Sequence, residues 1–346
     1  MKKIMVLGNY GYGVSGLDGQ VIKTINIYNL ILKHHPDQTR KVDTLEHIKR
    51  PWKIFPLLFN LLKIDTLIII PGQNCFIYFL PLCYFLSKMA KFNIICICVG
   101  GWQYEFFAGK ENGHSHRYIM NICRKIKCFM PELQRVNNDL IEHFNFKNTK
   151  IFPNFKEIPP LPAIQNRTDK QLKIVFCARI NKNKGFHMVF DAIKSWKDKF
   201  PFHVTFYGDI ENEDRKDFFT LIEINKKYAS YNGLIPQNKV HVELAKHDIL
   251  VLPTKYYTEG FPGSILDAYI AGIPVVVTEW KHSHEFVVED KTGFIVPFTN
   301  GQSAFEKKIE SLFFDQAKLS KMKKAARKES LKYSDKIAWD LLKDLL

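Results

Sequence analysis

Two acidic residues surround the start of a predicted helix in the second half of the chain. Glu259 lies in a turn before Pro262, and Asp267 lies about one and a half turns into the helix. Proline suits the first helical position, because the N–H that it lacks would have no helical partner there. The N–H groups of Gly263 and Ser264 are then available to a phosphate. Two carboxylates placed in this way can hold hydroxyl groups, one set on each sugar of a nucleotide-sugar. Taken singly, each acid is better explained as an ordinary helix residue, one compensating the dipole and the other solvated.

A pair of cations follows an earlier apolar run. The predicted strand 173–178 ends at Arg179, and Lys184 and Gly185 open the next helix. A guanidinium can donate to two phosphate oxygens, an ammonium acts as a point charge, and a helix N-terminus adds its own positive end. This arrangement indicates a diphosphate site. Two surface cations on a basic protein explain the same residues equally well, so the spacing alone leaves both interpretations open.

The first predicted strand is followed by a glycine-rich loop. Gly11, Gly13 and Gly16 form a G-x-G-x-x-G pattern, a fingerprint of dinucleotide binding. That fingerprint needs an acid about 20 residues further on, after a second strand, to hold a ribose. The candidates are Asp37 and Asp43, and neither follows a clear strand. The glycines therefore indicate a loop that a ligand can approach closely rather than an NAD site, and a simple connecting turn is the other alternative.

The elements that must position these residues form two series of apolar runs separated by segments of helical period. The predicted strands are 3–8, 66–70, 94–99 and 127–130 in the first series, and 173–178, 203–207, 249–253, 274–278 and 293–296 in the second. The predicted helices include 21–34, 54–63, 186–199, 216–229 and 262–271. This alternation predicts α/β domains with doubly wound parallel sheets, whose ligands bind beyond the carboxyl ends of the strands.

A proline-rich and polar stretch, 157–170, is the predicted linker between two domains. It separates an N-terminal domain, 1–156, from a C-terminal domain, 171–330. We expect the two Rossmann-like domains to face a cleft.

Composition bounds the class of protein. The 346 residues are 46% hydrophobic and 25% charged, which is typical of a folded globular protein. The seven cysteines show no C-x-x-C pair and no zinc-site spacing, so we expect small buried thiols in a reducing compartment, the cytoplasm. The longest apolar run, 76–86, covers about half of the roughly 20 residues that a spanning helix needs. The apolar run near the first residue, 4–8, is too short for a secretory signal.

The net charge is +15, and residues 1–165 carry 21 Lys and Arg against 11 Asp and Glu. A basic N-terminal half suits anionic lipid headgroups or a polyanionic acceptor. The stretches 51–63 and 76–91 mix aromatic residues with lysine, which suits contact with a membrane surface. Helix faces buried against the sheet are the alternative explanation for each stretch. No nucleic-acid-binding motif accompanies the charge, so we expect no nucleic acid partner.

The run from Glu259 to Thr278, E-G-F-P-G-S-I-L-D-A-Y-I-A-G-I-P-V-V-V-T, closely resembles the signature of retaining nucleotide-sugar glycosyltransferases of family 4. That family has the GT-B fold of two Rossmann-like domains, and its signature contains two acids separated by seven residues. Further elements of the family match Arg179, Lys184-Gly185, Gly208, Pro153-Asn154 and the loop from Gly16 to Gly19. The resemblance is dense over 173–297 and sparse over 1–155.

The resemblance implies a role for each matched residue. Arg179 and Lys184 bind the donor diphosphate and stabilise the departing nucleotide, Glu259 holds hydroxyls of the donor sugar, and Asp267 holds the ribose. The other implied donor-binding residues are Gly16, Gly19, Gly208, Phe261, Pro262, Gly263 and Ser264. Two cations and a helix N-terminus can stabilise a diphosphate leaving group without a metal. The chain contains no D-x-D motif, so we expect no metal and no cofactor.

One departure from the family concerns the loop after the predicted strand 94–99. Many relatives carry a histidine there that contacts the donor sugar. In this chain the loop has the sequence G-G-W-Q-Y-E, whose last residue is Glu105, and it contains no histidine. Glu105 is a candidate for the active-site or acceptor loop, and a solvated loop acid is the alternative. In GT-B relatives the last helix, here about 331–346, crosses back onto the N-terminal domain, where we expect Trp339 to pack.

These residues together predict a metal-independent, retaining glycosyltransferase that moves a sugar from a nucleoside-diphosphate sugar to a glycan or lipid-linked acceptor. Resemblance to capsule and exopolysaccharide enzymes favours bacterial surface polysaccharide synthesis, in the cytoplasm or peripherally at the inner face of the cell membrane. The alternatives are a nucleotide-sugar-binding protein without turnover, favoured by the missing histidine, and an NAD-dependent oxidoreductase that uses the glycine loop.

Overall fold

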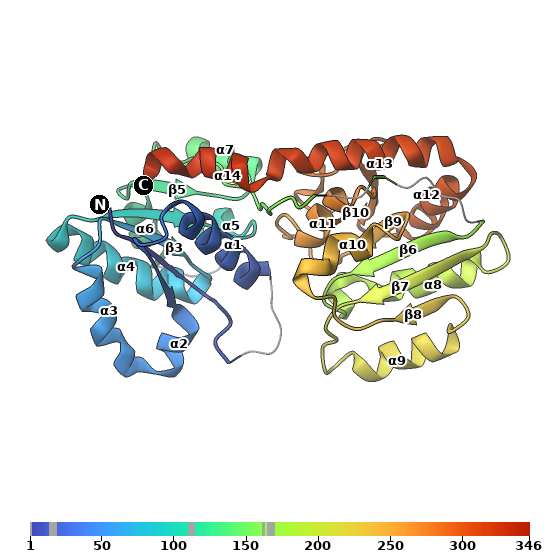
Figure 1. The fold of residues 1–346 in the computed structure, drawn as a ribbon, viewed down its shortest axis with the longest axis horizontal. Coiled ribbons are helices and arrows are strands. Elements are labelled where there is room, and N and C mark those ends of the chain that lie inside the picture. The colour runs from blue at the N-terminus through green and yellow to red at the C-terminus, as the bar shows by residue number, and fades with distance from the viewer. Residues whose placement is uncertain (1, 14–18, 110–114, 161–162, 165–169) are drawn as a thin grey trace. The chain divides into compact units, whose positions relative to one another are not determined.

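The computed structural model describes residues 2–13, 19–109, 115–160, 163–164 and 170–346 (Figure 1). These residues divide into two compact units. Unit 1 contains residues 1–157 and 334–346, and unit 2 contains residues 158–333. Each unit is an α/β layer structure with its own parallel sheet.

Unit 1 is built on a five-stranded sheet in the order β2-β1-β3-β4-β5, in which all neighbouring strands are parallel. Its strands are β1 (Ile4–Gly8), β2 (Thr39–Asp43), β3 (Thr66–Ile70), β4 (Asn93–Ile97) and β5 (Cys128–Met130). Its helices are α1 (Gly19–His34), α2 (Thr44–Lys49), α3 (Ile54–Leu61), α4 (Gln73–Ala90), α5 (Gln103–Phe107), α6 (Ser115–Cys123), α7 (Gln134–Phe144) and α14 (Asp335–Leu342). Short 3-10 turns occupy Pro51–Lys53 and Lys343–Leu345.

The central strands of unit 1 form because both of their faces are buried under helices. Every residue of β1 and β3 is buried. One core cluster joins Val6 of β1 and Ile97 of β4 to Ile27 of α1 and Leu342 of α14. The C-terminal helix therefore packs in unit 1, where the rings of Trp339 and His34 stack 3.7 Å apart.

The edge strand β2 is missing from the sequence prediction. Its residues Thr-Arg-Lys-Val-Asp are exposed or half-buried, because an edge strand beside β1 has little need of apolar side chains. Asp43 is the last residue of β2, so the expectation that no strand precedes this acid is wrong.

Unit 2 is built on a six-stranded sheet in the order β11-β10-β9-β6-β7-β8, again with parallel neighbours. Its strands are β6 (Leu172–Cys177), β7 (Phe202–Tyr207), β8 (Ala229–Tyr231), β9 (Ile249–Leu252), β10 (Val275–Thr278) and β11 (Gly293–Val296). Its helices are α8 (Phe186–Trp196), α9 (Arg215–Ile224), α10 (Val240–Leu244), α11 (Gly263–Ala271), α12 (Gln302–Phe314) and α13 (Gln316–Ser330). Its 3-10 turns are Lys182–Lys184, Gln237–Lys239, Ser283–Glu285 and Leu331–Tyr333.

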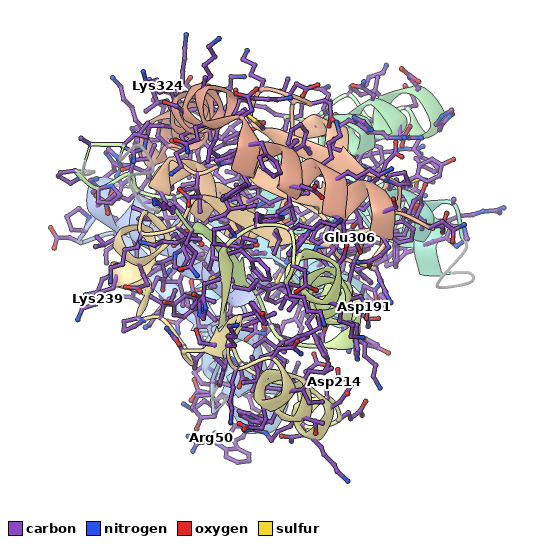
Figure 2. The ribbon with its side chains drawn as sticks, turned by 90° about the vertical axis from the view of Figure 1, so that its right-hand side faces the viewer. Arg50, Asp191, Asp214, Lys239, Glu306 and Lys324 are labelled. Carbon is purple, nitrogen blue, oxygen red and sulfur yellow. The ribbon has the colours of Figure 1, made fainter. Side chains whose placement is uncertain are left out.

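Contacts join five helices of unit 2 in a series. Helix α8 contacts α12, α12 contacts α13, and α13 and α10 both contact α11. Figure 2 shows charged side chains on their outer surfaces, where Asp191, Glu306 and Lys324 mark α8, α12 and α13. The strand order reverses at the centre of the sheet: the chain leaves β6 toward β7 and β8, then returns to β9 on the other side of β6. Parallel sheets bind ligands at such a switch point.

The doubly wound α/β prediction is confirmed for both sheets. The helix predicted over 216–229 is wrong at its end, because α9 stops at Ile224 and Ala229 begins the edge strand β8. All seven cysteines are free thiols, and all except Cys177 are buried. Over the part of the chain that the structure describes, no helix has both the length and the apolar character needed to cross a bilayer.

Candidate functional site

Two loops of unit 2 meet at the switch point, one after β6 and one after β9. Gly185 allows them to meet: its φ is +80°, and an added Cβ would lie 1.9 Å from the carbonyl oxygen of Pro253. No other residue fits this space or this backbone conformation easily. The N–H of Lys255 in turn donates to the carbonyl of Asn183 at 2.7 Å. The chain around residues 183–185 is therefore fixed against the residues that follow β9.

The side chains of Lys184 and Glu259 form an ion pair across this junction, from Nζ to Oε2. Their side chains are 23% and 15% exposed, so the pair is largely shielded but still open to a ligand. The Thr254 hydroxyl donates to the carbonyl of Asn183 at 3.1 Å and lies 3.5 Å from the same Glu259 oxygen. The sequence predicts separate roles for Lys184 and Glu259, and the structure places them in contact.

Arg179 is more exposed than Lys184. Its side chain is 46% exposed, and its Nη1 lies 3.6 Å from Oε1 of Glu211. The side chain of Asn181 donates to the same Glu211 oxygen at 2.7 Å and accepts from the N–H of Lys184 at 2.8 Å. Asn181 thus links the two cations through Glu211, whereas the described contacts include none between Arg179 and Glu259.

Helix α11 begins one residue later than predicted. Pro262 is its N-cap residue, with φ −59° and ψ 126°, and Gly263 is the first helical residue. The first intrahelical bond runs from the N–H of Ile265 to the carbonyl of Pro262 at 3.0 Å. The N–H groups of Gly263 and Ser264 precede this bond, so the helix itself gives them no acceptor. They remain the predicted phosphate-binding groups.

Phe261 is buried, and its ring stacks on Phe286 at a centroid distance of 4.0 Å and contacts Tyr333 at 4.7 Å. This packing fixes the chain just before α11. Phe261 therefore fixes the start of α11 through its core contacts. The sequence predicts Phe261 as a donor-binding residue and gives no sign of this packing role.

Asp267 has a partner that the sequence does not reveal. Its Oδ1 lies 2.8 Å from Nε2 of His241 in α10, and the two side chains are 10% and 13% exposed. Asp267 is therefore buried between helices rather than solvated, which excludes the ordinary explanation for this acid. The sequence around His241 contains no recognisable motif. His241 lies next to Asp267 because helices α10 and α11 are in contact.

Gly208 directly follows β7 and has φ +140°, and an added Cβ would lie 1.9 Å from the carbonyl of Ala178. This glycine is required so that the chain after β7 can pass close to the loop after β6. The neighbouring Tyr207 donates to Glu243 at 2.8 Å, and burial together with this bond raises the pKa of the phenol to about 12. The loops after β6, β7 and β9 are thus fixed by close backbone contacts.

The glycine loop of unit 1 is only partly described. Gly16 lies outside the described residues. Gly19 is the first residue of α1, and no atom lies within 4 Å of an added Cβ, so packing does not require glycine there. Asp43 accepts from the N–H of Tyr12 at 3.1 Å and from the N–H of Leu45 at 2.9 Å. Both carboxylate oxygens thus fix the loop and cap α2, rather than facing a ribose.

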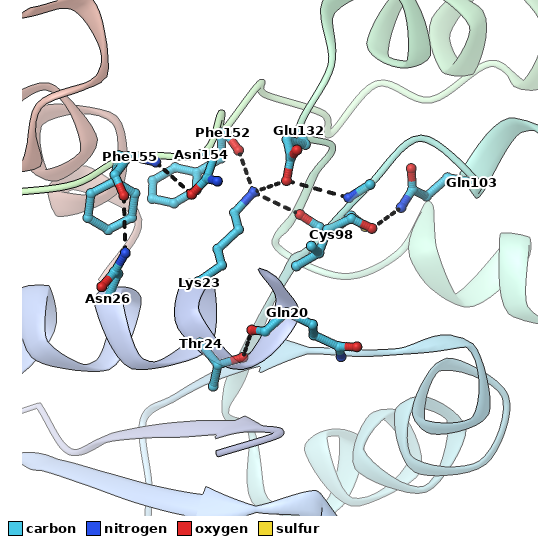
Figure 3. A network of polar contacts seen from close by, with 12 residues as sticks. Gln20, Lys23, Thr24, Asn26, Cys98, Gln103, Glu132, Phe152, Asn154 and Phe155 are labelled. Atoms are coloured by element: carbon cyan, nitrogen blue, oxygen red, sulfur yellow. Dashed lines mark hydrogen bonds and ion pairs between the residues drawn. The ribbon is translucent and has the colours of Figure 1, made fainter. Parts of the chain in front are cut away.

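Figure 3 shows a buried ion pair at the carboxyl edge of the unit 1 sheet, between Lys23 of α1 and Glu132 after β5. The Nζ to Oε2 distance is 2.7 Å, and the side chains are 1% and 2% exposed. The ammonium also donates to the carbonyls of Cys98 at 3.1 Å and Phe152 at 3.3 Å. The N–H of Gly100 lies 3.4 Å from the Glu132 carboxylate. The pair therefore ties the loop after β4 to α1 and to the chain after β5.

Glu105 follows this tied loop and lies half-buried in the short helix α5. The indole N–H of Trp102 donates to the carbonyl of Val99 at 3.0 Å and closes the turn before it. Glu105 belongs to unit 1 and the candidate donor residues to unit 2, so its role in the site stays a prediction.

Comparison with known proteins places unit 2 in a family. Residues 158–329 match the family described as "Glycosyl transferases group 1". These residues form a glycosyltransferase group 1 domain.

Curated relatives of this domain include the putative colanic acid biosynthesis glycosyltransferase WcaL of Escherichia coli strain K12. It is 28% identical over 167 residues, which are 46% of this chain and 40% of WcaL. The capsular polysaccharide biosynthesis glycosyltransferase CapM of Staphylococcus aureus is 23% identical over 66% of this chain and 58% of its own. The chain thus covers less than two thirds of the length of these relatives.

The glycosyltransferase domain and unit 1 together have the fold of a solved structure, that of Anabaena HepE in complex with UDP. The TM-score is 0.76 at 15% identity, and the likeness covers 99% of both chains. At this identity the likeness establishes the GT-B fold alone. The predicted fold and the resemblance to glycosyltransferases of bacterial capsule and exopolysaccharide synthesis are confirmed.

Proposed function

We propose that the protein is a retaining glycosyltransferase that transfers a sugar from a nucleoside-diphosphate sugar to a glycan or lipid-linked acceptor in bacterial surface polysaccharide synthesis. The observation that carries the proposal is the Lys184–Glu259 pair, held at the switch point of a glycosyltransferase group 1 domain ahead of the free N-terminus of α11. HepE, which has the same fold, has been solved with UDP-glucose. WcaL and CapM carry names from colanic acid and capsule synthesis.

The diphosphate is proposed to bind between Lys184 and the N–H groups of Gly263 and Ser264. Negative charge builds on the departing nucleotide as the bond to the sugar breaks. Cations and helix N–H groups already fixed in place stabilise that charge without reorganising. Arg179 adds a second cation, and its exposed guanidinium can turn from Glu211 toward an oxygen of the diphosphate.

Glu259 is proposed to hold hydroxyls of the donor sugar once the diphosphate has taken over Lys184. Asp267 is proposed to hold the ribose hydroxyls, with His241 fixing the carboxylate by the bond at 2.8 Å. Retention of the anomeric configuration follows from the family resemblance, and front-face transfer suits a site without an obvious protein nucleophile. The anomeric configuration of the product, measured by NMR, tests this part directly.

Metal independence is part of the same proposal. Two cations and a helix N-terminus supply positive charge to the diphosphate. In other glycosyltransferases a divalent ion stabilises the charge of the diphosphate in this way. We further propose that the protein works in the cytoplasm, where its seven free thiols suit a reducing environment, and that the basic unit 1 contacts the membrane surface.

A panel of nucleotides scored by thermal shift tests the function. We expect stabilisation by UDP or GDP, or another nucleoside diphosphate, and none by NAD. Stabilisation by NAD alone would favour an oxidoreductase. The nucleotide-sugar that matches the best nucleotide is then supplied with lipid-linked acceptors. Binding with no transfer to any acceptor and no hydrolysis of the donor would favour a binding protein without turnover.

A further inference from the structure

A charged cavity lies in unit 1, at the edge of its sheet opposite to the carboxyl ends of the strands. It has a volume of about 280 Å³ and lies where β4 and β5 begin. Four lysines line it, and no acidic residue does: Lys88, Lys91, Lys125 and Lys127. We call the cavity that these four side chains line the lysine cavity.

The four cavity lysines have no carboxylate partner among the described residues, unlike two other lysines of unit 1, Lys23 and Lys53. Lys23 pairs with Glu132 and Lys53 pairs with Glu46, at 2.7 Å and 2.6 Å. Within the described residues, by contrast, none of the four cavity ammonium groups is in an ion pair or donates a hydrogen bond. Lys88 lies 4.9 Å from the centre of the Tyr84 ring. The cavity is therefore a concentration of uncompensated positive charge.

Helix capping explains only part of this charge. Helix α4 ends at Ala90 and α6 ends at Cys123, so two helix C-termini point toward the four lysines. Each C-terminus carries roughly half a negative charge, or about one in total against four positive charges. Partial burial and the nearby Lys2 lower the pKa of Lys127, which agrees with an unbalanced positive field. An excess of positive charge remains for a ligand.

The same end of unit 1 carries an exposed apolar stripe on α4. Tyr78, Phe85 and Met89 are 71%, 64% and 65% exposed. Their spacing of seven and four residues places them on one face of the helix, which runs toward the lysine cavity. Helix α3 contacts α4 (Figure 1) and also exposes Phe55 and Phe59. Aromatic and apolar side chains next to lysines match a lipid bilayer, whose surface offers phosphates above its acyl chains.

We propose that the lysine cavity binds the phosphate group of an anionic lipid headgroup, while the stripe of Tyr78, Phe85 and Met89 enters the same bilayer. The occupant is the surface of an anionic membrane, because the cavity offers four positive charges and the adjoining helix face is apolar. The inference deepens the membrane contact in the proposed function, and it locates that contact at the amino-terminal edge of the sheet. The donor site belongs to unit 2 and does not depend on it.

Sedimentation with vesicles tests the proposal. Vesicles of phosphatidylcholine with phosphatidylglycerol are compared with vesicles of phosphatidylcholine alone. Each lysine near an anionic surface contributes about 1 kcal/mol, so the double variant Lys125→Gln/Lys127→Gln should bind anionic vesicles roughly 25-fold more weakly. The matched control is Lys197→Gln/Lys216→Gln, two exposed lysines of unit 2 that are in no described ion pair. The control removes the same charge, so it should bind nearly as the parent does.

Two further measurements separate this proposal from its alternatives. Phe85→Ser/Met89→Ser should also weaken vesicle binding, whereas a purely electrostatic surface would leave it unchanged. Calorimetry with inorganic phosphate tests for a site that serves a soluble anion. Equal losses for the cavity and control variants, or phosphate binding that the cavity variant loses while vesicle binding persists, would overturn the proposal. Vesicle binding is measured without nucleotide, so failure here leaves the donor-site results standing, and the reverse also holds.

Discussion

Replacing Glu259 by glutamine should tighten the binding of a nucleoside diphosphate while it slows transfer. The ammonium of Lys184 is paired with Glu259, at side-chain exposures of 23% and 15%. A diphosphate must therefore compete with that carboxylate for the ammonium. Glutamine keeps the size of the side chain and removes its charge, so the competition weakens.

The size of the effect follows from the exposure of the pair. Ion pairs that reach solvent contribute about 0–1 kcal/mol, and this pair lies toward the upper part of that range because it is largely shielded. A gain of about 0.5–1 kcal/mol corresponds to a dissociation constant roughly two- to five-fold lower. Turnover should change in the opposite direction. If Glu259 holds sugar hydroxyls in the transition state, the loss of hydrogen bonds to a charged group costs about 1.5–3 kcal/mol, or roughly 10- to 150-fold in kcat.

The assay is calorimetry with the best-binding nucleoside diphosphate, together with saturating kinetics on the matching nucleotide-sugar. Glu223→Gln is the control, because Glu223 pairs with Lys226 at 2.7 Å on a fully solvated surface of unit 2. Circular dichroism excludes misfolding. Weaker nucleotide binding by Glu259→Gln would refute the competition, and parental turnover would refute its role at the donor sugar.

Four further predictions concern the remaining parts of the site and of unit 1. Arg179→Ala or Lys184→Ala should each weaken nucleoside-diphosphate binding by about 1.5–3 kcal/mol in calorimetry, and unchanged affinity in both variants would remove the phosphate site. Transfer should persist in excess EDTA; loss that magnesium or manganese restores would require a different donor site. Asp267→Asn should weaken binding of both the free nucleotide and the nucleotide-sugar, and His241→Ala should do so by about 0.5–1.5 kcal/mol, with parental affinity in either variant counting against the ribose assignment. Lys23→Met should lower the free energy of unfolding by about 3–5 kcal/mol in urea titrations, because it removes the ammonium group that balances the charge of a buried carboxylate; a change below 1 kcal/mol would contradict the network of Figure 3.

The sequence predicts the elements whose side chains are buried on both faces. The predicted bounds of β3 agree with the structure to the residue, because its apolar run is continuous and ends at Pro71. The bounds of β11 also agree, because this edge strand is mostly apolar. Two other edge strands are different. β2 is polar and β8 has three residues, so neither produces an apolar run long enough to recognise. Because the sequence does not predict β2, it also does not predict that Asp43 lies at the end of a strand.

The features of the candidate site also differ in whether the local sequence or only the tertiary fold reveals them. Local sequence indicates a turn, a proline and two small residues at the start of α11, and the structure places that helix start within one residue. Contacts made by the fold have no local signal. Lys184 is 75 residues from Glu259, and His241 is 26 residues from Asp267. Only Gly185 gave a partial clue, because a glycine beside a cation at a helix start is typical of a close backbone approach.

Each acid of the signature is paired with a basic side chain in the structure. Glu259 has Lys184 and Asp267 has His241, so donor binding under the proposed function is an exchange of partners rather than an addition of charge to an open site. In that proposal the diphosphate binds the ammonium of Lys184, and the Glu259 carboxylate is then released to accept hydroxyls of the sugar. A free sugar without its diphosphate would meet a carboxylate that is still occupied. The Lys184–Glu259 pair can therefore make recognition of the sugar conditional on recognition of the nucleotide, which suits an enzyme that must not act on sugars that lack a leaving group.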